Sequence, residues 1–325
     1  MSKAIRFHAI GGPEVLRLEE VEVAPPGPGE VRLRQTAIAV NFRDILLRRG
    51  AHAVPTLPSG LGIESAGIVE TVGAGVTGIA AGDRVACVTG PDGAYAEVRN
   101  VPAARVVPLP PGISENTAAA MMVRGMTARY LLRETYAVQA GYTILVHAAA
   151  GGVGVILCQW AKRLGATVIG TVGSEAKAAV ARANGCDHAI VYTREDFAAR
   201  VREITGGRGV PVVYDSVGRT TFEGSLACLA PRGVLASFGE ASGDPEPIAP
   251  RRLGQLGSIF LTHPSLPHYT ATRTELLATA SDLFAVVLAG HVRIDISRTF
   301  ALAEAGHAHA EMESRRTTGS IILVP

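Results

Sequence analysis

The sequence of 325 residues lacks the features that would indicate a membrane protein or a nucleic-acid-binding protein. No apolar run reaches the roughly 18 uninterrupted residues that a membrane-spanning helix needs, and residues 1–9 show no apolar stretch typical of a secretory signal. The formal net charge is only +2 and no block of like charge is present, so we expect neither nucleic acid nor a membrane as a partner. These absences favour a cytoplasmic location.

Cysteine is scarce as well. The four cysteines, Cys87, Cys158, Cys186 and Cys228, lie far apart and form no Cys-x-x-Cys pair. This pattern gives no support to a zinc ribbon or to a thioredoxin-like redox site. We expect four small, buried thiols in a reducing compartment.

The apolar content of 47% is enough to bury a sizeable core, and the length suggests about two domains. In the first third, short Val- and Ile-rich runs alternate with Gly- and Pro-rich turn signals, for example at residues 25–29 and 73–75. Many short strands separated in this way are typical of a β-rich, barrel-like domain.

After about Met122, buried strands alternate with helices. Strands are expected at residues 143–147, 166–170, from about 189, at 210–214 and at 234–238. This alternation predicts a parallel, doubly wound sheet. A closing strand at residues 321–324 indicates that the C-terminal tail returns to the first domain. The predicted fold class is therefore α/β, with a first domain at residues 1–122 and 266–325 and a second at residues 123–265.

A glycine motif, Ala-Ala-Gly-Gly-Val-Gly at residues 149–154, lies between the first of these strands and the next helix. It fits the dinucleotide fingerprint G-x-G-x-x-G with Ala149 in place of the first glycine. Gly151 would let the backbone approach a pyrophosphate, and Gly154 would let the helix pack closely on its strand. The N–H groups at the helix start would then bind the phosphates. A turn needed only for packing is the alternative, but the surrounding βα units favour a Rossmann dinucleotide-binding domain.

The segment about twenty residues further on indicates which dinucleotide is bound. NAD-dependent enzymes usually place Asp or Glu there to bind the ribose 2′-hydroxyl, whereas this chain has Thr-Val-Gly-Ser at residues 171–174. Gly173 leaves room, Ser174 offers a hydroxyl, and Lys177 adds a positive charge, which suits the 2′-phosphate of NADPH. Glu175 is an acid in the same segment, although it also favours a helix N-terminus. A solvated surface lysine is the alternative role of Lys177.

Short motifs occur in a fixed order along the whole chain. They are Phe-His at 7–8, Gly-Gly-Pro-Glu-Val-Leu at 11–16, Asn-Phe-Arg-Asp at 41–44, Leu-Pro-Ser-Gly-Leu-Gly at 57–62, Gly-Asp-Arg-Val at 82–85, the glycine motif, Gln-Trp-Ala-Lys at 159–162, Tyr-Asp-Ser-Val-Gly at 214–218 and Glu-Ser-Arg at 313–315. In this order they resemble the zinc-independent quinone oxidoreductase (zeta-crystallin-like) branch of the medium-chain dehydrogenase/reductase superfamily, and its bacterial NADPH:quinone oxidoreductases most of all.

This resemblance implies a GroES-like substrate domain, a Rossmann domain, a cleft between them, and a homodimer. It places Asn41 beside the nicotinamide, as a tentative catalytic residue. The other cofactor-binding residues that it implies are Arg124 at the phosphates or ribose; Ala150, Gly151, Gly152, Val153 and Gly154 at the pyrophosphate; Gly173, Ser174, Lys177 and Tyr192 at the 2′-phosphate; Ser216 and Val217 at the adenine or ribose; Phe238 and Gly239 at the nicotinamide; and Arg315 from the tail.

No metal is expected. Zinc-dependent relatives carry Gly-His-Glu where this chain has Gly62, Ile63 and Glu64, and Asn-Phe-Arg-Asp at 41–44 occupies the stretch of their cysteine ligand. Close relatives also often have tyrosines after Asn41, whereas this chain has Leu46 and His52, so the resemblance does not define the size and polarity of the quinone pocket.

Without a metal to polarise it, the acceptor must already be electrophilic, as quinones and α,β-unsaturated carbonyls are. We expect hydride transfer from NADPH to the conjugated system of a quinone, with solvent or Asn41 satisfying the oxygen that gains charge. Two alternatives stay open at this point. One is an NADPH-dependent reductase of enones, and the other is a non-catalytic NADPH-binding protein.

Overall fold

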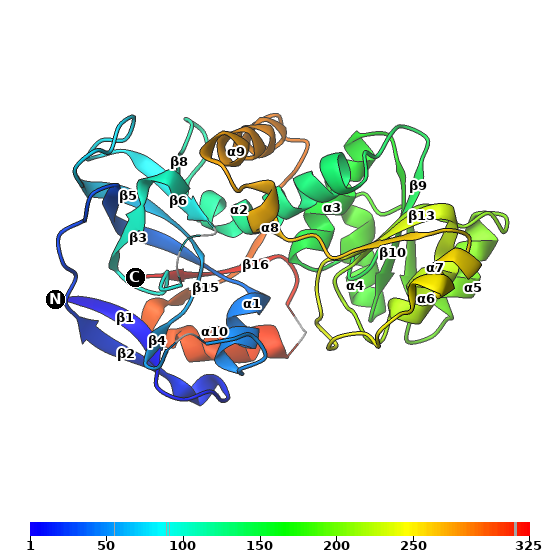
Figure 1. Ribbon diagram of the computed structural model, residues 1–325, viewed down its shortest axis with the longest axis horizontal. Helices are drawn as coiled ribbons and strands as arrows, with labels where there is room; N and C mark the ends of the chain where they lie inside the picture. The colour runs from blue at the N-terminus through cyan, green and yellow to red at the C-terminus, as the bar shows by residue number, and fades with distance from the viewer. Residues whose placement is uncertain (55, 89, 91, 315–316) are drawn as a thin grey trace. The chain divides into compact units, whose positions relative to one another are not determined.

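The computed structural model describes residues 1–54, 56–88, 90, 92–314 and 317–325, and its chain divides into two compact units. Unit 1 consists of Met1–Val123, Thr270–Leu288 and Ile294–Pro325, and unit 2 of Arg124–Tyr269 and Ala289–Arg293. The division falls inside helix α2 (Glu115–Tyr130). The predicted α/β class is confirmed, because unit 2 contains a parallel sheet flanked by helices and unit 1 is rich in strands (Figure 1).

Unit 1 contains two sheets. The smaller has the order β2-β1-β4, and the larger the order β15-β16-β3-β5-β6-β8, with β7 also paired to β3. Their bounds are β1 Ser2–Phe7, β2 Leu16–Val21, β3 Glu30–Val40, β4 Ser59–Gly60, β5 Glu64–Val72, β6 Arg84–Val88, β7 Val98–Pro102, β8 Val106–Pro108, β15 Ile296–Ala301 and β16 Ser320–Val324. The helices are α1 (Phe42–Arg48), α9 (Arg273–Leu288) and α10 (Ala305–Glu313), with the first part of α2.

Strand β3 organises unit 1. Its side chains alternate between two cores: Leu33 packs in one apolar cluster, while Ile38 and Val40 pack in another with Phe7 and Tyr95. Strand β16, at the C-terminal end of the chain, pairs antiparallel with the end of β3. The C-terminal strand therefore completes the sheet beside the residue that follows β3, Asn41.

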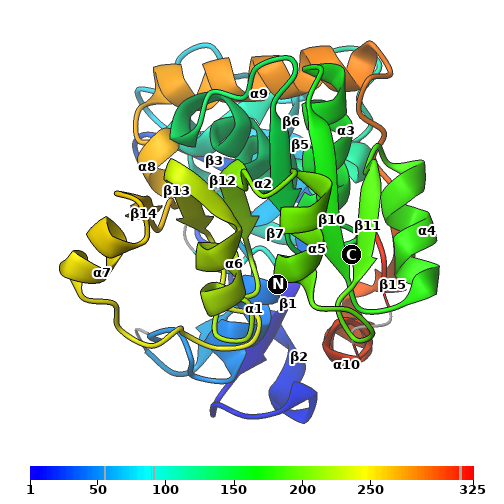
Figure 2. The same ribbon diagram turned by 90° about the vertical axis from the view of Figure 1, so that its right-hand side faces the viewer.

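Unit 2 has six parallel strands in the order β11-β10-β9-β12-β13-β14. They are β9 Thr143–Val146, β10 Thr167–Val172, β11 His188–Val191, β12 Val210–Asp215, β13 Leu229–Ser237 and β14 Phe260–Thr262. The helices are α3 Gly152–Arg163, α4 Glu175–Ala183, α5 Phe197–Ile204, α6 Phe222–Cys228, α7 Pro250–Gln255 and α8 Leu266–Tyr269. Helix α3 packs beside α4, and α5 beside α6 (Figure 2). The first five strands were expected from the sequence, whereas β14 was not.

The sheet of unit 2 buries an apolar core against α5 and α6. Leu145, Ile169, Val213 and Leu235 project from four neighbouring strands into one cluster that also contains Phe222. Strands with such continuous burial are typical of parallel sheets covered by helices. None of the helices in the described part of the chain has the length and apolarity that crossing a bilayer requires.

Candidate functional site: the carboxyl edge of the parallel sheet

The strand order of unit 2 fixes where a ligand can bind. Numbered along the chain from β9, the strands lie in the order 3-2-1-4-5-6, and the chain moves outward in opposite directions from β9 and β12. In open α/β sheets, ligands bind at the carboxyl ends of the strands, at the point where the direction reverses. The loops after β9, β10, β12 and β13 are therefore the ones that can form a nucleotide site.

The glycine loop after β9 makes a tight turn into α3. The turn is made by Ala148, whose φ of +52° lies in the left-handed region, and Gly151 N–H donates to the Ala148 carbonyl over 2.8 Å. A Cβ on Gly154 would overlap the Ala148 carbonyl oxygen and lie 2.9 Å from the Cα of Ala149. The predicted role of Gly154 in close packing therefore agrees with this geometry. Ala149 was expected to take the place of the first glycine of the fingerprint, but the residue with the left-handed conformation is Ala148, one position earlier.

Arg124 lies directly against this loop. A Cβ on Gly152 would come within 2.6 Å of the Arg124 Nε atom. The guanidinium can lie at this place because the glycine has no side chain. Arg124 is buried, with 5% of its surface exposed. Gly152 and Val153 begin α3, whose first N–H groups have no partner within the helix. A cation and the positive end of a helix thus meet at one place, which suits an anionic group.

The ends of β10 and β11 bring four predicted residues together. Ser174 is the N-cap of α4, and its hydroxyl oxygen accepts the Lys177 backbone N–H over 3.4 Å. The phenol oxygen of Tyr192 lies 3.0 Å from where a Cβ of Gly173 would be, so Gly173 makes room for that ring. The nearby acid, Glu175, pairs with Arg194 over 3.2 Å. A second acid, Glu195, accepts the Val191 N–H and pairs with Arg200 over 3.5 Å. The edge therefore offers hydroxyls and cations, and both of these carboxylates have a cationic partner.

The loops after β12 and β13 also meet. Gly239 lies against the backbone of Ser216, because a Cβ there would come within 3.0 Å of the Ser216 carbonyl oxygen. Phe238 N–H donates to the Asp215 carbonyl over 2.8 Å, and the Val217 carbonyl accepts the Ser242 N–H, also over 2.8 Å. Four further predicted residues, Ser216, Val217, Phe238 and Gly239, therefore lie side by side.

Asp215, which sequence analysis missed, holds the loop after β12. One of its carboxylate oxygens accepts the N–H groups of Val217 over 2.8 Å and Gly218 over 3.1 Å, and the Thr221 hydroxyl over 2.9 Å. The other oxygen accepts the Ser225 hydroxyl over 2.7 Å. The carboxylate is fully buried. An Asp at a strand end before a glycine turn was the signal available in the sequence.

The network continues to His147, which is also buried. Its Nε2 lies 2.9 Å from the Ser225 oxygen and its Nδ1 lies 2.8 Å from the Thr171 oxygen. Because the Ser225 hydrogen is already donated to Asp215, His147 must donate from Nε2 and accept from Thr171 at Nδ1. Burial lowers the pKa of His147, although the Asp215 charge acts in the opposite direction. A neutral imidazole after β9 thus contacts Thr171 of β10 and Ser225 of α6, and Ser225 connects it to Asp215 at the end of β12.

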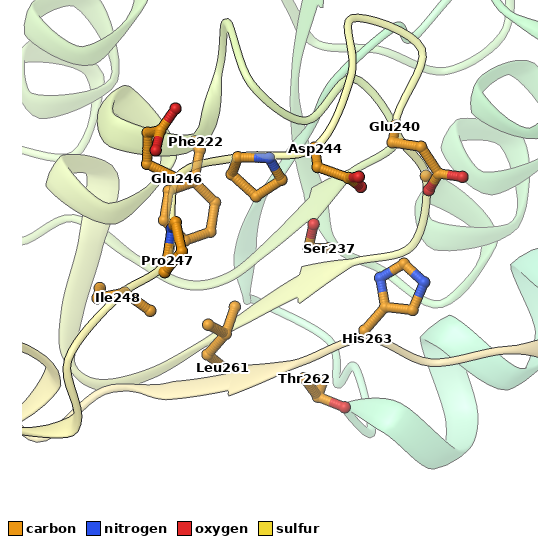
Figure 3. Close-up of a pocket in the computed structure, with 12 residues that line it drawn as sticks. Phe222, Ser237, Glu240, Asp244, Glu246, Pro247, Ile248, Leu261, Thr262 and His263 are labelled. Atoms are coloured by element: carbon orange, nitrogen blue, oxygen red, sulfur yellow. The ribbon is translucent and has the colours of Figure 1, made fainter. Parts of the chain in front are cut away.

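A pocket of about 280 Å³ adjoins the same edge beyond β13 (Figure 3). Gly239 lines it, and the Ser237 hydroxyl projects into it below Asp244 (Figure 3). Its other polar side chains are those of Glu240, Glu246, Thr262 and His263. The carboxylates of Glu240, Asp244 and Glu246 repel an anion, so this pocket is less suited to a phosphate than the glycine loop.

Asn41 belongs to unit 1. It is the N-cap residue of α1, only 6% exposed, and its amide Nδ2 donates to Glu64 Oε2 over 2.8 Å. The other Glu64 oxygen accepts the Val123 N–H over 2.6 Å. Within the described ranges, no three His, Cys, Asp or Glu side chains are grouped to hold a metal. Glu64 belongs to the segment 62–64, where zinc-dependent relatives have Gly-His-Glu. Its carboxylate accepts a hydrogen bond from the side-chain amide of Asn41. Arg315 lies outside the described residues.

Two family models match the chain. The "Alcohol dehydrogenase GroES-like domain" model matches residues 27–111, and the "Zinc-binding dehydrogenase" model matches residues 152–281. The first range contains Glu64 of unit 1, and the second begins at Gly152, within the glycine loop of unit 2.

Two curated relatives match over all or nearly all of their own length. The chain is 52% identical over 325 residues to the quinone oxidoreductase of Pseudomonas aeruginosa, covering 100% of both chains. It is 47% identical over 331 residues to 2-haloacrylate reductase from a Burkholderia species, covering 100% of this chain and 99% of the relative. Among solved structures, Escherichia coli quinone oxidoreductase complexed with NADPH superposes with a TM-score of 0.97 at 46% identity, covering 99% of this chain and 100% of that one.

Proposed function

Since the chain belongs to the zinc-independent quinone oxidoreductase family of medium-chain dehydrogenases/reductases, we propose that it is an NADPH-dependent oxidoreductase that transfers hydride to quinones. The observation that carries this proposal is the carboxyl edge of unit 2, where a Gly-rich helix start, Arg124, and the hydroxyls and cations beyond β10 gather. When bound, the cofactor supplies the hydride, and the protein supplies binding and orientation.

The residues at this edge fit a phosphorylated dinucleotide. We assign its binding to Arg124, Ala150, Gly151, Gly152, Val153 and Gly154 at the pyrophosphate, to Gly173, Ser174, Lys177 and Tyr192 at the 2′-phosphate, and to Ser216, Val217, Phe238 and Gly239 along the remaining path. Arg315 joins this assignment through the resemblance of its motif alone. The pairing of Glu175 with Arg194 and of Glu195 with Arg200 supports NADPH over NADH, because both acids near the ends of β10 and β11 have a cationic partner.

Asn41 is the residue that we propose to act on the acceptor. One N–H of its amide donates to Glu64, which fixes the plane of the amide. A neutral amide donor is suited to an oxygen that gains negative charge during hydride transfer to an already electrophilic acceptor. Solvent can supply the proton, so the proposal requires no general acid.

A second candidate function is reduction of an activated carbon–carbon double bond. The relative named 2-haloacrylate reductase is 47% identical over the whole chain and favours this reading. The two functions share the cofactor and differ in the acceptor, so a comparison of acceptors separates them.

The experiment is a fluorescence titration with NADPH and NADH, followed by steady-state rates on a panel of quinones and a panel of enones and haloacrylates. We expect tighter binding of NADPH and a higher kcat/KM for quinones. Preference for NADH would contradict the cofactor assignment. Faster turnover of the second panel would favour the alkene reductase, and NADPH binding without consumption on either panel would indicate a binding protein.

The variant Lys177→Gln tests the assignment of the 2′-phosphate in the same titrations. Loss of the charge beside Ser174 should weaken NADPH binding by roughly tenfold and leave NADH binding unchanged, because only NADPH carries the 2′-phosphate. Arg182→Gln is the matched control, since Arg182 is an exposed cation in the last turn of the same helix, α4. If the Lys177 variant lost affinity for NADPH and NADH equally, Lys177 would not bind the 2′-phosphate and would be a solvated surface lysine.

We also propose a homodimer formed through strand β14. This strand ends the sheet of unit 2, and it carries Phe260 with 60% of its surface exposed. A free strand edge with an exposed apolar side chain is a site of association. We expect a dimer by sedimentation velocity and a shift to monomer in Phe260→Asp. Leu288→Asp is the control, because Leu288 is exposed on α9 of unit 1; a monomeric wild-type protein would refute the proposal.

A cytoplasmic location is the last part of the proposal. The four cysteines, Cys87, Cys158, Cys186 and Cys228, are free and buried. Burial raises the pKa of the Cys186 thiol to about 11 and raises that of Cys87. Protonated, unpaired thiols of this kind are typical of proteins in a reducing compartment.

A further inference from the structure

A continuous chain of buried hydrogen bonds runs within unit 1 from α10 to the start of α1. Arg48 Nη1 lies 3.2 Å from His309 Nδ1, and His309 Nε2 lies 3.0 Å from the Tyr95 phenol oxygen. The Tyr95 hydroxyl donates to Asp44 Oδ2 over 3.0 Å, and the same oxygen accepts the Asn41 backbone N–H over 2.9 Å. All five residues are buried. The proposed acceptor-side residue is thus one end of a polar chain inside an apolar core.

The donors of this chain all point toward Asp44. A guanidinium only donates, so His309 accepts at Nδ1 from Arg48 and carries its hydrogen on Nε2. That hydrogen goes to the oxygen of Tyr95, whose own hydrogen goes to Asp44. Burial, with a smaller contribution from the Arg48 charge, lowers the pKa of His309 to about 3, so this imidazole stays neutral at physiological pH. Among the residues joined by these hydrogen bonds, Asp44 is then the one whose charge can change near neutral pH.

The surroundings of Asp44 allow its carboxyl group to change charge near neutral pH. Asp44 is fully buried, and its second carboxylate oxygen, Oδ1, has no hydrogen-bond partner within the described part of the polypeptide. Burial raises the pKa of Asp44 to about 6; the hydrogen bonds from Asn41 and Tyr95 and the charge of Arg43 act in the opposite direction, and the charge of Asp92 adds to the rise. The Arg43 and Asp92 side chains pair with each other over 2.6 Å. Asp44 is thus ionised above about pH 6 and protonated below it.

We propose that Asp44 is a positioning residue for Asn41: as a carboxylate it fixes the Asn41 backbone at the start of α1, and protonation at Oδ1 weakens that hold. A hydrogen bond to an ionised acceptor is roughly twice as strong as one to a neutral acceptor. Because the Asn41 amide is shared with Glu64, a backbone shift changes where its remaining N–H points. This inference rests on the proposed role of Asn41 in hydride transfer, and it adds a device that orients that residue.

The first test compares wild-type enzyme with Asp44→Asn, which keeps the shape and an acceptor oxygen but cannot ionise. We expect the ratio of their kcat values for quinone reduction to be roughly ten at pH 8 and near one at pH 5. The ratio cancels any pH effect on the chemical step itself. NADPH affinity should differ little between the two proteins, because the residues assigned to its pyrophosphate and 2′-phosphate lie in unit 2. A ratio that is constant across this range would overturn the inference while leaving the proposed function intact.

Two neighbouring variants assign the titrating group. Arg43→Gln should raise the pH at which the ratio changes, and Asp92→Asn should lower it, because these charges have opposite effects on the Asp44 carboxyl. They remove the two partners of one ion pair and leave the bond between Asp44 and Asn41 in place, so they are matched controls. A midpoint that does not move in either variant would contradict the assignment to Asp44.

A second measurement does not depend on turnover. In protein labelled with ¹⁵N-asparagine, the Asn41 backbone amide proton should shift with a midpoint near the pKa of Asp44, about 6, and should not titrate in Asp44→Asn. An Asn41 amide that does not titrate in wild-type protein would overturn the inference. Absence of all quinone turnover with a normal amide titration would instead refute the proposed function and keep the coupling of Asp44 to Asn41.

Discussion

Gly154→Ala is expected to destabilise the protein by about 3 kcal/mol or more, as a large fall in the urea midpoint. The new methyl group would overlap the carbonyl oxygen of Ala148 and press on the backbone of Ala149. Both neighbours are backbone atoms of the turn between β9 and α3, so they cannot move aside as a flexible side chain would. The helix must then shift from its strand, which loosens the core of unit 2.

Gly151→Ala is the matched control, because the two glycines lie in the same loop. Gly151 is the N-cap of α3 with φ −82°, which alanine adopts freely, and a Cβ there would lie 3.1 Å from the Ala148 carbonyl oxygen. We expect stability within about 1 kcal/mol of wild type and a loss of NADPH affinity, since the methyl group would occupy the approach to the pyrophosphate. Equal unfolding midpoints for the two variants would show that Gly154 is not needed for packing.

The glycine loop shows how far the sequence could define the site. The turn into α3 and the close packing at Gly154 could be predicted, because a fixed spacing of glycines after a strand has one common structural use. The contact of Gly151 with a pyrophosphate stays a prediction. The left-handed conformation of Ala148 could not be predicted, since alanine carries no signal for positive φ. Strand β14 was missed for a related reason, because Phe260–Thr262 is too short to show a period of its own.

The polar networks were beyond prediction because their members are distant in the sequence. Tyr95 is 51 residues from Asp44 and 214 residues from His309, and nothing in the local pattern links them. The Asn-x-x-Asp spacing at residues 41–44 is a helix N-terminal signal, so the bond between Asn41 and Asp44 was within reach of sequence reasoning. What the pattern could not give is the burial of Asp44, which decides its charge.

The buried carboxylate of Asp215 should show the second large effect. Asp215→Ala is expected to cost roughly 3–5 kcal/mol, because it leaves the backbone N–H groups of Val217 and Gly218 without their acceptor and removes a charged acceptor from the Thr221 and Ser225 hydroxyls. The loop that carries Ser216 and Val217 would lose its fixed position, so NADPH affinity should fall together with the free energy of unfolding. Urea unfolding and NADPH titration measure the two effects.

Asp215→Asn should be far milder, because the network can reverse. The amide oxygen can still accept from Val217 and Gly218, while the amide nitrogen would donate to Ser225. Ser225 would then donate to His147 Nε2, and His147 would carry its hydrogen on Nδ1 and donate to Thr171. Imidazole ¹⁵N chemical shifts distinguish these two tautomers. An unchanged His147 tautomer, or an Asn variant as unstable as the Ala variant, would mean that the carboxylate acts through its charge and not through the hydrogen bonds that it accepts.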